Sequence, residues 1–258
     1  MQAELSSFIA RAKGICAEDT RIVALLACGS IASGAADRYS DIDLVVVCGN
    51  DAYDGIMHSR ESFAAKLGIL LSSFTGEHVG EPRLLICLYD DPILHVDLKF
   101  IAEDDLGHGV EKPLVLFSRC KSIAQIVESG VYEWPSRNSE WFEARFWIWM
   151  HYCAGKIARG ELFEAHGMLA FAREHVIGPM IARSKGLRER GVRRIESESP
   201  EWAAKLARTI PTCDKSGTID AMLATIEFYK ELRKDIAPQQ ADDKTARAVI
   251  KFIKTECG

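Results

Sequence analysis

Apolar residues in the first half of the chain follow two spacings, one typical of helices and one typical of strands. Residues 3–16 carry apolar side chains at helical spacing, which predicts an amphipathic helix. The segments "RIVALLACG" (21–29) and "DIDLVVVC" (41–48) predict two strands separated by a turn. A second helix is predicted over 52–73. The apolar residues at helical spacing in this second helix are Ile56, Phe63, Leu67, Leu70 and Leu71.

Two further strands are predicted before residue 115. They are "RLLICLYD" (83–90) and "ILHVDLKFI" (93–101), and the residues between them, Asp90, Asp91 and Pro92, are typical of a hairpin turn. Four strands and two helices within about a hundred residues indicate a small domain that combines both kinds of element.

Strand signals fade from about Val115 onward, and helical spacing replaces them. A helix with a thick apolar face is predicted over 138–160, with Ser139 as its N-cap, and another over 161–186, with Gly186 as its stop. Three shorter helices are predicted over 199–209, 219–235 and 243–255. Apolar residues at three- and four-residue steps are typical of a helical bundle.

The expected fold class is therefore α+β. We expect a small N-terminal domain with a mixed sheet over residues 1–115, followed by a C-terminal helical bundle over residues 116–258. At 258 residues the chain is long enough for two such domains, and its 27% of charged side chains is typical of globular proteins.

Charge and cysteine usage narrow the class of protein. Up to Val115 there are 9 Lys and Arg against 18 Asp and Glu, and beyond it 23 against 19, so the balance changes from −9 to +4. No dense basic patch with interleaved aromatic residues is present, which disfavours a nucleic-acid partner. Eight cysteines without a C-x-x-C pair disfavour a zinc site or a disulfide scaffold. No apolar run is long enough to cross a bilayer, and the charged N-terminus is unlike a secretory signal, so we expect a cytoplasmic protein without a membrane partner.

Two aspartates stand one residue apart at the start of the apolar strand predicted over 41–48. Side chains alternate along a strand, so Asp41 and Asp43 project from one face, and Ile42 and Leu44 from the other. Two carboxylates on one face repel each other unless a cation lies between them, and Mg²⁺ prefers such ligands together with substrate phosphates. The alternative is that an isolated D-x-D pair only closes a surface loop.

The residues before this pair favour the metal interpretation. Gly29 and Ser30 end one predicted strand and begin a short turn, "IASGAA". Glycine allows the backbone to approach a phosphate closely, free N–H groups at such a turn attract anions, and the serine hydroxyl adds a donor. A phosphate-binding turn near a metal-binding pair is suited to a metal-bound nucleoside triphosphate.

A third carboxylate is present in the strand predicted over 93–101. Asp97 lies on the face opposite to Val96 and Leu98, and an acidic residue in mid-strand is costly without a partner. If this strand pairs beside Asp43, Asp97 completes a three-carboxylate site for two metal ions. The alternative is that Asp97 pairs with Lys99 or Arg83 on a solvated face.

The stretch "GSIASGAADRYSDIDL" resembles the G-S-x(10)-D-x-D signature of the nucleotidyltransferase superfamily that includes DNA polymerase β. With a later acidic strand and a helical second half, the chain resembles the bacterial nucleotidyltransferases that act on aminoglycosides or lincosamides. The signature covers about sixteen residues, and the two-domain layout extends the resemblance over most of the chain. Ser33 stands where many relatives carry a basic residue, so one phosphate contact is absent or comes from elsewhere.

The resemblance implies roles for five residues of the first half. Gly29 and Ser30 would hold the triphosphate, and Asp41 and Asp43 would bind Mg²⁺. Asp97 matches the third carboxylate, which in relatives either binds metal or serves as the base toward the acceptor hydroxyl. That hydroxyl would attack the α-phosphorus and release pyrophosphate.

The helical half also resembles the second domain of these enzymes and supplies further candidates. Lys156 and Arg159 would bind the nucleotide phosphates, or they only complement the dipole at a helix end. Glu140, Glu143 and Glu161 are alternatives to Asp97 as general base, or they are ordinary helix residues.

The sequence therefore predicts a Mg²⁺-dependent nucleotidyltransferase with two metal ions. Its co-substrate would be ATP or another nucleoside triphosphate, and it would place AMP on a hydroxyl of a small acceptor, an aminoglycoside or a lincosamide, as an antibiotic-resistance enzyme would. A monomer and a homodimer are both compatible with the sequence. The alternatives are transfer to a protein or RNA acceptor, and a non-catalytic nucleotide-binding module.

Overall fold

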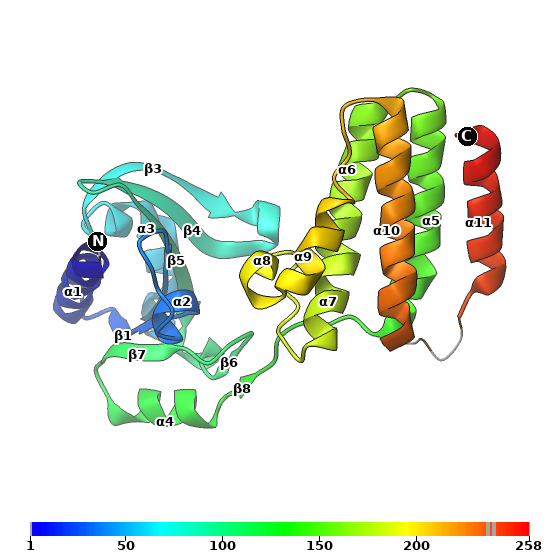
Figure 1. The fold of residues 1–258 in the computed structure, drawn as a ribbon. Coiled ribbons are helices and arrows are strands. Elements are labelled where there is room, and N and C mark those ends of the chain that lie inside the picture. Colours follow the sequence, from blue (N-terminus) through cyan, green and yellow to red (C-terminus); the bar gives the residue numbers. More distant parts are fainter. Residues whose placement is uncertain (1, 236–237, 239–240, 258) are drawn as a thin grey trace. The chain divides into compact units, whose positions relative to one another are not determined.

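The computed structural model describes residues 2–235, 238 and 241–257. The chain divides into two compact units, 1–134 and 135–258 (Figure 1). The sequence placed the division at 115/116. It lies later because residues 114–118 form a strand that pairs with the first strand of the sheet, and because the helix that follows packs on that sheet.

The first unit begins with the elements that carry the glycine-serine turn and the aspartates. In chain order its elements are α1 (Gln2–Glu18), β1 (Ile22–Ala27), α2 (Gly29–Ala32), β2 (Ile42–Cys48), η1 (Asn50–Ala52), α3 (Tyr53–Ala64), β3 (Ile69–Gly76), η2 (Glu77–Val79), β4 (Glu81–Asp90), β5 (Leu94–Ala102), η3 (Glu103–Asp105), β6 (His108–Gly109), β7 (Leu114–Ser118), α4 (Lys121–Ser129) and β8 (Val131–Tyr132).

Within the described residues, six of these strands form one sheet in the order β3-β4-β5-β2-β1-β7. The pair β2–β5 is parallel, and the other neighbours are antiparallel. The sheet is therefore mixed, and the predicted α+β class is confirmed. The short strands β6 and β8 pair separately, in parallel.

The two faces of the sheet bury different residues. One face packs against α1 and α3 through Ile42, Leu44, Val96 and Leu98, all of which are buried. The other face packs against α4 at the end of β2 that carries Val47. Because side chains alternate, Asp43 and Asp97 lie on this second face, at the opposite end of β2.

The helix predicted over 52–73 is too long. The helix α3 ends at Ala64, and Leu70 and Leu71 belong to β3, the edge strand of the sheet. Apolar residues every three or four positions continue through this boundary, so periodicity alone did not show the change. The pairing of β3 with the full length of β4 decided the outcome.

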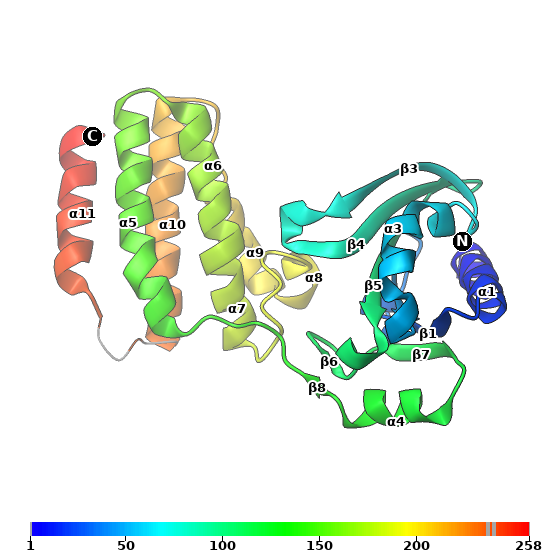
Figure 2. The same ribbon diagram turned by 180° about the vertical axis from the view of Figure 1, so that it is seen from behind.

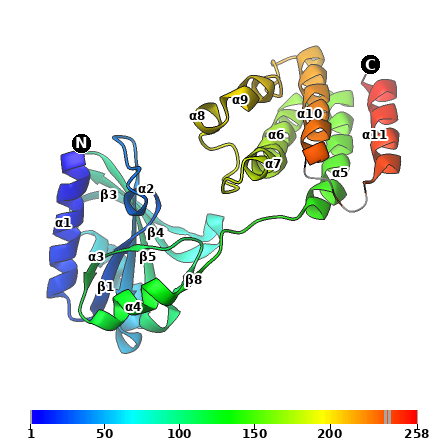
Figure 3. The same cartoon turned by 60° about the horizontal axis from the view of Figure 1, so that its bottom comes forward.

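The second unit is helical, as predicted. Its elements are α5 (Ser139–Ala158), α6 (Leu162–Ala172), the π-helix η4 (Arg173–Ile177), α7 (Gly178–Ser184), α8 (Ile195–Glu198), α9 (Pro200–Ala207), α10 (Lys215–Asp235) and α11 (Asp243–Glu256). The helices α6 and α10 pack on α5, and α11 packs on the other side of α5 (Figures 2 and 3). Their shared core contains Phe146, Trp147 and Tyr229.

The ends of these helices follow from local chemistry. The N-cap of α5 is Asn138, whose side chain accepts a hydrogen bond from Trp141 N, so the predicted Ser139 cap is wrong by one residue. The predicted stop at Gly186 has a φ of +67°, in the left-handed region. No helix in the described ranges is long and apolar enough to cross a membrane.

Candidate active site

The strand β1 ends in a glycine-serine turn that lies against the start of β2. The N–H of Cys28 donates a hydrogen bond to the carbonyl oxygen of Asp43 (2.9 Å). Gly29 then turns the chain with a φ of +59°, in the region that favours glycine. Ser30 follows in α2, and its Oγ is buried without a hydrogen-bond partner among the described residues. An unsatisfied hydroxyl of this kind is available to a ligand.

Gly29 also packs directly on the side chain of Asp43. A Cβ atom added to Gly29 would lie 2.2 Å from Asp43 Oδ2 and 3.3 Å from Asp43 Cγ. Glycine is therefore required here both by the backbone conformation and by the close approach of a carboxylate. The predicted phosphate-binding turn and the predicted metal ligand touch each other.

The third carboxylate lies directly beside the second. In the parallel β2–β5 pair, Ile42 is opposite Val96 and Asp43 is opposite Asp97. The partly exposed Asp43 and Asp97 share one face, while their neighbours Ile42 and Val96 are fully buried on the other. Asp41 directly precedes β2. The condition set for Asp97 to join the aspartate pair, namely that its strand lies beside theirs, is therefore met.

The charges at this end of the sheet repel one another. Burial raises the pKa of the Asp97 carboxyl, and the nearby negative charge of Asp41 raises it further. His95 acts in the opposite direction, because its Nε2 lies 2.9 Å from Asp97 Oδ1. The side chain of Asp97 is 23% exposed. A half-buried carboxylate beside a second one is an environment that a cation would stabilise.

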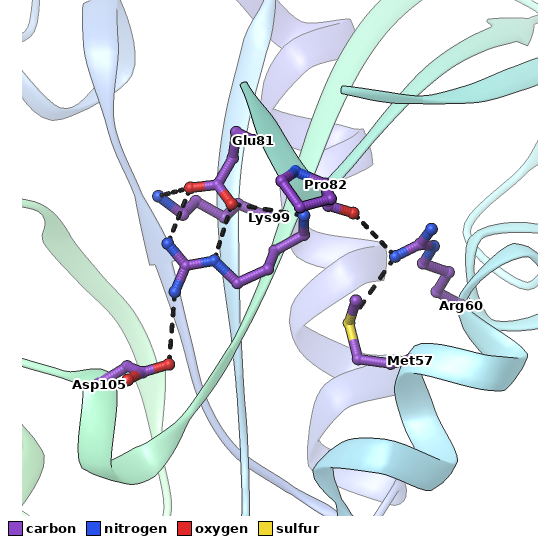
Figure 4. Close-up of polar contacts among 7 residues, drawn as sticks. Met57, Arg60, Glu81, Pro82, Lys99 and Asp105 are labelled. Atoms are coloured by element: carbon purple, nitrogen blue, oxygen red, sulfur yellow. Dashed lines mark hydrogen bonds and ion pairs between the residues drawn. The ribbon is translucent and has the colours of Figure 1, made fainter. Parts of the chain in front are cut away.

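The basic residues offered as alternative partners of Asp97 are bound elsewhere (Figure 4). Lys99 Nζ lies 2.7 Å from Glu81 Oε2, and Arg83 Nε lies 2.7 Å from Glu81 Oε1. Arg83 also contacts Asp105 at 3.3 Å. These two cations hold the pKa of Glu81 down to about 2, chiefly through the hydrogen bond from Arg83. Asp97 is paired with His95 instead.

The carboxylate oxygens at this end of the sheet are of the type that binds a divalent cation. As they stand, no three His, Cys, Asp or Glu side chains in ranges 2–235, 238 and 241–257 gather closely enough to hold a metal ion. Asp97 is turned toward His95, and Asp43 lies against Gly29. Asp43 and Asp97 nevertheless offer hard oxygen ligands on one face, opposite each other in two paired strands, and Asp41 directly precedes one of these strands. Their mutual repulsion would be relieved by Mg²⁺.

Two further residues complete the surroundings of the turn. Glu111 Oε1 accepts a hydrogen bond from Gly29 N at 2.6 Å, a contact across 82 positions that no sequence pattern indicated. Ser33 Oγ donates to the carbonyl oxygens of Gly29 (3.0 Å) and Ser30 (3.2 Å). Ser33 therefore stabilises the turn itself.

Lys156 and Arg159 lie at the C-terminal end of α5 in the second unit. Lys156 Nζ is 2.6 Å from Glu161 Oε2, and Arg159 Nη1 is 3.8 Å from Glu161 Oε1. The hydrogen bond from Lys156 lowers the pKa of Glu161, so this side chain stays ionised. The role of the two cations in nucleotide binding stays a prediction.

Glu143 has a structural environment that does not suit a general base. Only 5% exposed, it accepts hydrogen bonds from Trp147 Nε1 (3.1 Å), Tyr229 Oη (2.5 Å), Arg233 Nη1 (3.1 Å) and the backbone N–H of Asp242 (2.9 Å). These donors come from α5, from α10 and from the residue before α11. The carboxylate thus joins three segments of the bundle, a role that helical periodicity does not reveal.

Comparison with known proteins finds a family match for the unit that carries this site. Residues 9–132 match the model of the nucleotidyltransferase domain. No match is found among curated proteins. Among solved structures, the chain is similar to an aminoglycoside 6-adenyltransferase from Bacillus subtilis, with 15% sequence identity, 96% of each chain covered and a TM-score of 0.39. The domain match confirms the predicted superfamily and enzyme class. Because the TM-score is low, no conclusion about this chain is drawn from the structural similarity.

Proposed function

We propose that this chain, whose residues 9–132 form a nucleotidyltransferase domain, moves a nucleoside monophosphate, AMP from ATP, onto a hydroxyl of a small acceptor. The observation that carries the proposal is the arrangement around Asp43. This carboxylate lies opposite Asp97 in the β2–β5 pair and touches Gly29 of the glycine-serine turn. A phosphate-binding turn and a carboxylate face in contact are what a metal-bound triphosphate requires.

Each residue of the site has a proposed role. The Gly29 amide and the Ser30 hydroxyl bind phosphate oxygens, and Asp41, Asp43 and Asp97 would hold one or two Mg²⁺ ions. When bound, Mg²⁺ would neutralise phosphate charge that the protein face itself repels.

The proposed reaction is an in-line displacement at the α-phosphorus. The oxygen of the acceptor hydroxyl bonds to the α-phosphorus, and the bond from this phosphorus to the bridging oxygen breaks, so pyrophosphate leaves with the electron pair. The hydroxyl proton passes to a carboxylate. Asp97 suits this step, since burial raises its pKa and makes it a better proton acceptor than an ordinary aspartate. Glu140 and Glu161 are alternative bases, and Lys156 and Arg159 would bind the nucleotide from the second unit.

The acceptor class follows from charge. The balance of −9 over the first 115 residues attracts a cationic acceptor, which favours an aminoglycoside over an uncharged or anionic one. A lincosamide is the second candidate. In either case we propose a cytoplasmic antibiotic-modifying enzyme, acting as a monomer or a homodimer. Transfer to a protein or RNA acceptor is the alternative function.

The test is a product assay with the full chain. The protein is incubated with Mg²⁺, each of the four nucleoside triphosphates in turn, and a panel of aminoglycosides and lincosamides, and the acceptor mass is measured. The proposal expects one acceptor class to gain the mass of AMP with release of pyrophosphate. A mass gain on the protein itself or on added RNA, with no change in any small acceptor, would overturn the acceptor assignment.

A further inference from the structure

Glu111 occupies the backbone donor that the proposed function assigns to phosphate. It lies between β6 and β7, and its Oε1 accepts the Gly29 N–H at 2.6 Å. A carboxylate and a phosphate present the same kind of acceptor oxygen to an amide, and one N–H makes one strong bond at a time. A phosphate oxygen and Glu111 therefore compete for Gly29.

The segment that carries Glu111 is anchored on both sides. Its start pairs with β8: Val131 N donates to the carbonyl oxygen of Gly107 (2.8 Å) and Glu133 N to that of Gly109 (2.9 Å). On the other side, Lys112 Nζ lies 2.6 Å from Glu128 Oε2 on α4. The carboxylate is thus presented to Gly29 by a defined backbone.

Glu111 adds a further negative charge to the carboxylate end of the sheet. Burial raises the pKa of the neighbouring Cys28 thiol to about 12, and the charges of Glu111 and Asp43 both contribute. Both carboxylates therefore act on the same short segment. An anion that arrives without a cation is repelled by these charges and finds the Gly29 amide occupied.

We infer that Glu111 is a specificity-determining residue, which holds the Gly29 amide until a metal-bound polyphosphate displaces it. An anion that brings its own divalent cations neutralises the carboxylate face and can take over the amide. Inorganic phosphate and metal-free pyrophosphate bring no cation, so they cannot displace Glu111 from the Gly29 amide. The apparent affinity for any phosphate ligand is its intrinsic affinity reduced by the fraction of molecules in which the amide is free. This inference rests on the proposed function and deepens it.

The test measures binding of pyrophosphate and ATP to the full chain by calorimetry, each with and without Mg²⁺. The variants are Glu111→Gln, which keeps the shape and removes the charge, and Glu111→Ala, which removes the acceptor. The matched control is Asp104→Asn, which removes one exposed carboxylate on η3, at the other end of β5. We expect Glu111→Ala to bind metal-free pyrophosphate about tenfold more tightly than wild type, the factor that corresponds to one charged hydrogen bond. Glu111→Gln, whose amide oxygen still accepts the Gly29 N–H, should bind it with an affinity between those of wild type and Glu111→Ala. The control should bind as wild type does.

A second measurement reports on the contact without any ligand. The Gly29 amide proton, bonded to a carboxylate, should resonate downfield in wild type and move upfield in Glu111→Ala. Unchanged pyrophosphate affinity in both variants, or weaker affinity, overturns the inference, since weaker affinity would make Glu111 a contributor to binding. Where wild type turns over Mg²⁺-ATP and the variants bind like it, only the role of Glu111 fails. Where wild type neither binds nor turns over Mg²⁺-ATP, the proposed function fails, and the inference with it.

Discussion

Replacing Gly29 by alanine tests the contact that joins the phosphate-binding turn to the carboxylates. The new residue would have to adopt a φ of +59°, which costs about 1–2 kcal/mol for a residue with a Cβ. Its Cβ would also lie 2.2 Å from Asp43 Oδ2, so the carboxylate has to rotate away, at about 1 kcal/mol for a strained side chain. We expect the free energy of unfolding to fall by about 2–3 kcal/mol. A displacement of about 1 Å at a catalytic group typically lowers activity about 100-fold.

The matched control is Gly34→Ala. Gly34 has a similar φ of +71°, and nothing lies within 4 Å of its added Cβ, so this variant has the backbone strain without the collision. The free energy of unfolding of Gly34→Ala, measured with urea, should be about 1–2 kcal/mol lower than that of wild type. Its rate of pyrophosphate release with Mg²⁺-ATP and an acceptor should stay near the wild-type rate. Equal activity in the two variants would refute the reasoning that Gly29 is required by its contact with Asp43.

Two further predictions concern stability. Glu81→Gln removes the carboxylate that binds Lys99 and Arg83. The pKa of Glu81 is lowered from 4.5 to about 2 in the folded protein. The contribution of Glu81 to the free energy of unfolding is therefore fully present above pH 4.5 and is lost as the pH falls through about 2. At pH 7, urea unfolding should show that the variant has a free energy of unfolding about 1–2 kcal/mol lower than wild type, a difference already reduced by solvent screening. The free energies of wild type and variant should converge as the pH falls to 2. A difference that does not change with pH would contradict the charge argument. Glu143→Gln removes the buried charged partner of Arg233, which keeps its contact with the exposed Asp243. The free energy of unfolding of the helical unit, measured by thermal unfolding, should therefore fall by about 3 kcal/mol. The control Glu140→Gln, at an exposed position of the same helix, should change it by less than about 1 kcal/mol. Similar losses in both would show that burial of Glu143 is not what matters.

Local patterns were sufficient to predict the fold class and most of the elements. Alternation placed Asp43 and Asp97 each on the polar face of its own strand, and the structure has them opposite each other because the two strands pair. The strand over 114–118 was missed because it is short and its role depends on pairing with β1, far away in the sequence. The edge strand β3 was taken for helix because its apolar residues fit both periods.

The site was predictable where the motif is local and not where it depends on long-range contacts. The glycine, the serine and the two aspartates fall within sixteen residues, so their spacing carried the prediction. Glu111 reaches Gly29 across 82 positions, and Glu143 meets Arg233 across 90, so neither contact leaves a periodic signal. A glutamate on a helix offers the same pattern whether it is a general base or a buried structural acceptor. Only burial and its donors distinguished Glu143.

The carboxylates that lie against the glycine-serine turn are, in our proposal, required for nucleotidyl transfer. The most direct measurement is the rate of pyrophosphate release from Mg²⁺-ATP, with the acceptor identified by mass, in Asp41→Asn and Asp43→Asn compared with the control Asp104→Asn. We predict that the rate falls by about 100-fold or more in each of the first two variants and stays at the wild-type level in the control. Wild-type rates of release in Asp41→Asn and Asp43→Asn would contradict the account.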